Sequence, residues 1–311
     1  MIHGIGTGVF WALETIVFAL VLSKGGFTDS PQAIFLAPFV AAFLNDTFSN
    51  LWLLAFRKSN KYYRKGKVWD ALKKKNGRLL ILSGLFGGPL GMSAYLLAIK
   101  YVGTSYAAAL SALFPVIGSI IAWVFFKERL SKIQMSGIVF CTFGVIGMAG
   151  FSNGSMDNVI YLIFALTCAL FWGLEGVISS YAMKDGELSY EIALQIRHMT
   201  SVVCYSILFL PILKAWGFTL DILKDHRIIA FLLLTALLET ISYLLYYKAF
   251  SMIGAPKAMS LNVTYIMWSI LFGVILFRQY PSVNEIISIL ILMFGIILVA
   301  LFERGREERV V

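Results

Sequence analysis

Charged residues are scarce in this sequence: they make up 14% of the chain, whereas 59% of it is hydrophobic. A soluble domain of 311 residues cannot cover that much apolar surface, so the composition excludes an ordinary soluble protein. Apolar windows of roughly 18 to 25 residues recur along the whole length, which is typical of transmembrane helices. The sequence therefore predicts an all-α integral membrane protein that spans a lipid bilayer.

Cysteine and histidine are also rare, with three of each. Cys141, Cys168 and Cys204 lie in apolar stretches without metal-site or disulfide spacing, and we expect them to be packing residues. The histidines are isolated, and the sequence has no glycine-rich phosphate loop and no nucleophile elbow. We therefore expect no enzyme activity, no metal site and no cofactor.

Basic residues outnumber acidic ones, 26 to 17, which gives a formal net charge of +9. Ten of the 26 Lys and Arg residues fall in the single stretch 57–78, which has one acid, Asp70. A basic loop between apolar spans is explained by the positive-inside rule or by contact with anionic lipids. The charge therefore does not indicate a nucleic-acid partner.

Ten apolar spans are present, joined by short connectors rich in turn residues such as those at 25–26, 152–154 and 184–186. If the N-terminus is cytoplasmic, the inner loops and helix ends contain 19 Lys or Arg and the outer side contains six. This bias predicts that both termini are cytoplasmic. The predicted spans are 4–23, 31–56, 79–99, 104–126, 133–151, 159–183, 190–213, 228–250, 256–277 and 285–302.

The chain repeats itself. The string FWALE at 10–14 returns as FWGLE at 171–175, and FKERLS at 126–131 aligns with FRQYPS at 277–282. Tyr-Leu-Leu occurs at 95–97 and again 148 positions later. Two halves of five helices each are inverted relative to one another, because five is odd. We expect a first repeat over 1–151, a second over 152–303 and a cytoplasmic tail over 304–311.

Each FWxLE copy offers an aromatic ring and a carboxylate to one helix face, since residues three apart are neighbours on a helix. The pairs are Trp11 with Glu14 and Trp172 with Glu175. An ionisable group inside a membrane is costly and marks a polar cavity or an ion pair. Ordinary core packing is the alternative for each ring alone, but it does not explain the repeated pair.

Three further ionisable residues lie inside the spans. Arg197 needs an acidic partner, for which Glu175 is the first candidate and Glu239 the second. Asp46 follows Asn45, and both a structural and a functional role stay open for it. If transport is coupled to protons, Glu14, Glu175, Arg197 and Glu239 are the candidates for proton coupling or ion pairing.

Two aromatic stripes complete the candidate site. Glu239 is followed at helical spacing by Tyr243 and Tyr246, and Asn262, Tyr265 and Trp268 follow one another in three-residue steps. Aromatic faces beside carboxylates favour a quaternary ammonium ion, which is bound by cation–π contact because it has no N–H donor. An amino acid would also need a cation for its carboxylate. Spans five and ten have few polar residues and are expected to be scaffold or an oligomer surface, in a monomer or homodimer.

The sequence resembles the EamA branch of the drug/metabolite transporter superfamily and, within it, the Lic-type choline permeases of bacteria. The strings behind this resemblance lie at 87–92, 100–105, 172–180, 196–197, 241–247 and 261–265, and the likeness extends over nearly the whole chain.

The resemblance implies a secondary transporter in the bacterial plasma (inner) membrane that imports choline, possibly with protons. By position, Trp11, Trp172, Tyr243, Tyr246 and Tyr265 would supply the rings, and Glu175 and Glu239 the charge. The alternatives are an EamA-type exporter of amino acids, metabolites or toxic compounds, and a membrane receptor that binds without transport.

Overall fold

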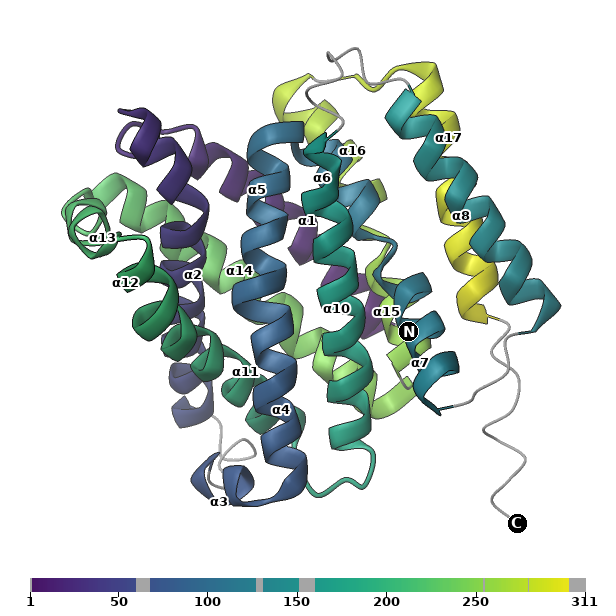
Figure 1. Cartoon of the computed structure of the whole chain (residues 1–311), viewed down its shortest axis with the longest axis horizontal. Coiled ribbons are helices and arrows are strands. Elements are labelled where there is room, and N and C mark those ends of the chain that lie inside the picture. The colour runs from purple at the N-terminus through teal and green to yellow at the C-terminus, as the bar shows by residue number, and fades with distance from the viewer. Residues whose placement is uncertain are drawn as a thin grey trace.

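The computed structural model of the protein describes residues 2–59, 68–126, 131–150, 160–253, 255–278 and 280–301. Within these residues all regular structure is helical, as the composition predicts (Figure 1). Three predicted features fall wholly or partly outside the described residues: the FKERLS string, the turn at 152–154 and the tail over 304–311. The central part of the basic loop, 60–67, does so too.

The first helix of the described residues is α1, which begins at Ile2. The bounds of the helices in the first part of the chain are α1 Ile2–Leu22, α2 Pro31–Ser59, α3 Val68–Lys73, α4 Lys75–Leu85, the π-helical turn η2 Phe86–Met92, α5 Ser93–Val102, α6 Thr104–Ser111, α7 Phe114–Phe126 and α8 Lys132–Gly150. Helices α4, η2 and α5 form one continuous helical span.

The second part of the chain contains a corresponding set. Its helices are α10 Leu162–Met183, α11 Tyr190–Cys204, the π-helical turn η3 Tyr205–Phe209, α12 Leu210–Ile212, α13 Trp216–Ile222, α14 His226–Ile253, α15 Ala255–Asn262, α16 Tyr265–Phe277 and α17 Val283–Leu301. The short helices α3 and α13 lie in connectors and were not predicted from the sequence.

Six helical stretches in the described residues are long and apolar enough to cross a membrane: Ile2–Leu22, Pro31–Lys58, Lys75–Val102, Leu162–Met183, Tyr190–Ile212 and His226–Met252. Shorter apolar helices lie at Ala109–Ile121, Tyr265–Phe277 and Val283–Leu298. The protein is a multi-pass membrane protein. Helices lie over all ten predicted ranges, but that all ten cross the membrane in two inverted repeats stays a prediction.

Helices α1 and α10 pack against different sets of helices. Helix α1 packs against α14, α15 and α16, whereas α10 packs against α4, η2, α5, α6 and α7. Helices α8 and α17 pair closely with one another at one edge of the molecule (Figure 1). A Cβ atom on Gly144 or Gly295 would overlap the facing helix, so glycine allows this close pairing.

Two predicted spans are broken in the structure. The span 104–126 is interrupted between α6 and α7 at Ala112 and Leu113, and the span 256–277 between α15 and α16 at Val263 and Thr264. The two breaks are 151 positions apart, the same offset that aligns 126–131 with 277–282. Both breaks lie beside the aromatic cavity described below.

Candidate functional site

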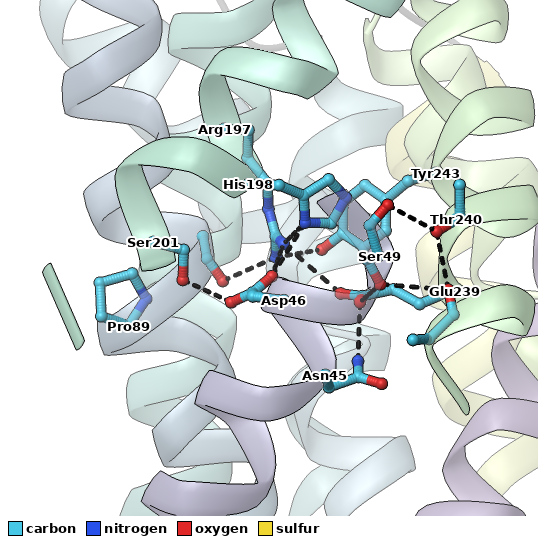
Figure 2. A network of polar contacts seen from close by, with 12 residues as sticks. Asn45, Asp46, Ser49, Pro89, Arg197, His198, Ser201, Glu239, Thr240 and Tyr243 are labelled. Atoms are coloured by element: carbon cyan, nitrogen blue, oxygen red, sulfur yellow. Dashed lines mark hydrogen bonds and ion pairs between the residues drawn. The ribbon is translucent and has the colours of Figure 1, made fainter. Parts of the chain in front are cut away.

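A fully buried arginine lies at the centre of the polar network (Figure 2). Arg197, on α11, places Nη1 2.6 Å from Oδ1 of Asp46 on α2. Its Nε lies 3.4 Å from Glu175 on α10, and its Nη1 lies 3.4 Å from Glu239 on α14. Its Nη2 donates to the Tyr243 hydroxyl at 3.0 Å. One guanidinium therefore joins four helices and compensates several buried carboxylates.

The glycine-rich turn η2 allows this cluster to form. A Cβ on Gly87 would overlap the Glu175 carboxylate, and one on Gly88 would overlap the Ser201 side chain. The Gly87 carbonyl accepts hydrogen bonds from Trp172 Nε1 at 3.2 Å and from Arg197 Nη2 at 3.4 Å. Because glycine has no side chain, η2 supplies space for the carboxylate, and its Gly87 carbonyl supplies an acceptor.

Asp46 and His198 fix one side of the arginine. His198 Nδ1 lies 2.9 Å from Oδ1 of Asp46, and the Ser201 hydroxyl donates to Oδ2 of Asp46 in a short hydrogen bond (Figure 2). Together with Arg197, these contacts satisfy both oxygens of the carboxylate. Asp46 is therefore held in place as the main partner of the guanidinium.

Glu239 and Glu175 each accept further hydrogen bonds. Oε2 of Glu239 accepts from the Ser49 hydroxyl at 2.5 Å and from Asn45 Nδ2 at 2.7 Å. Oε1 of Glu175 accepts from the Tyr247 hydroxyl at 3.1 Å. These neutral donors stabilise the charged form of each buried carboxylate.

An aromatic cavity lies directly beside the cluster. Trp11 is at its centre, with ring centroids 5.1 Å from Trp172, 5.4 Å from Tyr243 and 6.5 Å from Tyr265. The enclosed volume is about 20 Å³, room for about one water molecule. The lining residues are Thr7, Trp11, Phe114, Trp172, Glu175, Gly176, Ser242, Tyr243, Tyr246, Asn262 and Tyr265.

Seven of the nine residues predicted to bind substrate line this cavity; the two that do not are Glu14 and Glu239. Glu14 is buried, and neither of its carboxylate oxygens has a hydrogen-bond partner among the described residues. The Oδ1 atom of Asn262 is likewise buried without a partner there. Trp268 lies outside the cavity and stacks on Phe272 instead, with ring centroids 6.1 Å apart.

Both predicted partners contact Arg197, but its closest partner, Asp46, was not predicted as one. Tyr95 was missed as well: its ring lies 4.9 Å from Trp172 and 6.1 Å from Trp11. The internal repeat could have predicted Tyr95 as a site residue, because Tyr95 aligns with Tyr243 at the 148-residue offset.

Three of these groups resemble a set of metal ligands. The side-chain ligand atoms of Asp46, His198 and Glu239 lie within 4.8 Å of one another. Nη1 of Arg197, however, lies 2.6 Å from Asp46, 3.4 Å from Glu239 and 3.0 Å from His198. A guanidinium among all three ligands leaves no room for a metal ion beside it and already supplies the positive charge.

The sequence profile of the EamA-like transporter family matches the chain in two segments, residues 1–150 and 159–301. This chain belongs to the EamA-like transporter family. It is therefore a member of the drug/metabolite transporter superfamily, and the expected resemblance is confirmed.

Several proteins are similar to this EamA-family chain. Protein LicB of Haemophilus influenzae is 34% identical over 99% of both chains. An uncharacterized inner membrane transporter of Salmonella typhimurium, YicL, is 24% identical over 84% of both. A solved crystal structure matches with a TM-score of 0.57 and 16% identity over 96% of this chain and 99% of its own, which supports the fold. The family and the printed name of YicL point to a transporter.

A second, larger cavity of about 580 Å³ opens between the ends of helices α1, α5, α16 and α17. It is lined by Leu22 and Ser23 at the end of α1, Lys100 near the end of α5, Phe277 at the end of α16 and Glu285 at the start of α17. We call it the vestibule. On α1 it reaches Ile16, five residues and thus about 7.5 Å along the helix from Trp11 of the aromatic cavity.

Proposed function

We propose that this protein is a secondary transporter that imports choline or a related quaternary ammonium cation by alternating access. The observation that carries the proposal is the aromatic cavity itself, in which indole and phenol rings surround a single carboxylate, that of Glu175. A methylated ammonium cannot donate N–H hydrogen bonds, so ring faces and a nearby negative charge are the groups that bind it. Similarity to the Lic-type permeases supports the same substrate class.

The state of Arg197 argues against an amino-acid substrate. A zwitterion needs a cation for its carboxylate, and Arg197 is the one Lys or Arg of the described residues that contacts the cavity wall. Its guanidinium is already engaged by Asp46, Glu175 and Glu239. A substrate carboxylate would have to displace all three acids from the guanidinium, whereas a cation competes with the guanidinium for Glu175 alone.

We further propose that the ten spans form two inverted five-helix repeats over 1–151 and 152–303. Two matched family segments and the two helix breaks 151 positions apart support this division. Rocking of inverted repeats about a central site is a common basis for alternating access.

The cavity, at about 20 Å³, is far smaller than ordinary ligand pockets of about 300 Å³ or more, so binding requires the helices to separate. At one end of α1 the packing is tight: a Cβ on Gly4 would lie 2.6 Å from Cβ of Leu261, and Thr7 Oγ1 lies 3.0 Å from Ser242 Oγ. At the other end lies the vestibule. We propose that the structure is a closed state whose next opening is on the vestibule side.

The proposed orientation places both termini in the cytoplasm of a bacterial plasma (inner) membrane, with the vestibule outside. The excess of Lys and Arg in the predicted inner loops supports this orientation. A cysteine replacing the exposed Ser23 should react with an impermeant thiol reagent from outside, and one replacing Asp185 only after permeabilisation. Reaction of both from the same side would contradict it.

Radiolabelled choline uptake into proteoliposomes tests the function. An inside-negative potential of 100 mV is worth about 2.3 kcal/mol for a monovalent cation, so even uncoupled import should reach about a fiftyfold gradient. If an imposed pH gradient raises the accumulation of choline further, that result indicates proton coupling. Absence of choline binding and uptake, with resistance to toxic compounds on expression, would favour the exporter.

A further inference from the structure

Arg197 contacts two walls of the aromatic cavity from behind. Its Cζ atom lies 4.4 Å from the centroid of the Tyr243 ring. Its Nε atom lies 3.4 Å from Oε1 of Glu175. Because Tyr243 and Glu175 both line the cavity, a cation of the protein already contacts the ring and the carboxylate that a bound ammonium would need.

The contacts of Arg197 differ in strength. The 2.6 Å contact with Asp46 is a short, charge-assisted hydrogen bond, whereas those with Glu175 and Glu239 are long at 3.4 Å. Asp46 is also fixed by His198. The pair of Arg197 and Asp46 is therefore the stable unit, and the contact with Glu175 is the one most easily exchanged.

We propose that Arg197 is an internal competitor of the transported cation. In the ligand-free protein the guanidinium neutralises Glu175 and faces Tyr243; an arriving quaternary ammonium takes over both groups while Arg197 stays with Asp46. Arg197 is thereby a positioning residue that lowers the affinity and permits release on the other side of the membrane. This inference rests on the proposed function.

The competition gives Arg197 a role in coupling binding to movement. Arg197 and Asp46 belong to α11 and α2, whereas Glu175 belongs to α10 and Tyr243 to α14. When the substrate cation replaces Arg197 at Glu175, the ion pair between α11 and α10 is lost. A ligand that weakens contacts between helices favours the conformation in which those helices separate.

Removing the pair as a unit tests this, because a buried charge left without its partner is strongly destabilising. The variant Asp46→Asn with Arg197→Met leaves the formal charge of the four groups at −2, since one acid and one base are lost together. We expect the Kd for choline chloride, measured by titration calorimetry, to fall by about five- to fiftyfold. Unchanged or weaker binding in a folded double variant overturns the inference.

The exposed ion pair of Asp221 and Lys224, at 2.7 Å, gives the matched control. Asp221→Asn with Lys224→Met should leave the Kd unchanged. If the cluster variant does not fold, a structure of the wild-type protein with choline decides: a distance beyond 4 Å between Arg197 Nε and Glu175 supports the competition, and an unchanged contact overturns it. Wild-type protein that does not bind choline overturns the proposed function and this inference together, whereas the double variant tests the inference alone.

Discussion

The hydroxyl of Ser111 lies 2.8 Å from the hydroxyl of Tyr265, which links the two broken helical spans at their breaks. Ser111 is the last residue of α6, and Tyr265 is the first residue of α16. This contact joins the two proposed repeats next to the aromatic cavity, which the Tyr265 ring also lines. One side chain therefore contributes to the contact between the two breaks and to the wall of the site.

The two roles of Tyr265 are separable. Tyr265→Phe removes the hydroxyl but keeps the ring, so we expect a loss of about 1 kcal/mol of stability with choline affinity nearly unchanged. Tyr265→Leu should also weaken binding about tenfold, as loss of a cation–π contact predicts. Thermal unfolding and calorimetry measure the two effects. In a double-mutant cycle with Ser111→Ala the losses should not add, and full additivity would contradict the direct contact.

Gly87 is predicted to be intolerant of any side chain. Gly87→Ala places a methyl group where the Glu175 carboxylate lies, so the carboxylate must leave its present position beside Arg197. We expect choline uptake to fall at least tenfold. Gly217→Ala on α13 is the control, because a Cβ there meets no heavy atom within 4 Å. Equal uptake by both variants would show that Glu175 has room to move.

The rings at the centre of the cavity should determine the affinity for choline. Trp11→Leu, Trp172→Leu and Tyr243→Leu are each expected to raise the Kd for choline about three- to thirtyfold, the range that one cation–π contact of roughly 0.5 to 2 kcal/mol predicts. Trp123→Leu, at an indole that is 48% exposed on α7, should leave the Kd unchanged. Unchanged affinity in all three cavity variants would refute the aromatic cage.

Much of the site followed from the cost of burying charge and from the repeat. Arg197 inside an apolar span required an acid, and Glu175 and Glu239 both contact it as expected. The sequence did not predict that Asp46 is the closest partner of Arg197. The rotation of α2 about its own axis is decided by packing, which hydrophobic periodicity alone does not resolve. Asn45, the neighbour of Asp46, donates to Glu239, so the middle of α2 contacts both Arg197 and Glu239.

The helix breaks illustrate a different limit of the sequence. Pro115 follows the first break and lacks an N–H, which suits the start of α7. The second break, at Val263 and Thr264, has no proline or glycine within it. Only the comparison of the two halves at the 151-residue offset connects the two helix breaks. Tertiary contacts therefore override local propensity at the second break.

Glu14 is the buried acid with the clearest means of binding a proton. Both of its oxygens are buried without a hydrogen-bond partner among the described residues, an environment in which a charged carboxylate is costly and a neutral acid is tolerated. Glu14→Gln should therefore fold with near wild-type thermal stability and bind choline, yet lose any dependence of uptake on a pH gradient. Glu239→Gln is the contrasting variant: Glu239 accepts from Ser49 and Asn45 and contacts Arg197, so its loss should destabilise the fold by about 3 kcal/mol. Uptake that keeps its full pH-gradient dependence in Glu14→Gln would exclude Glu14 as the proton carrier.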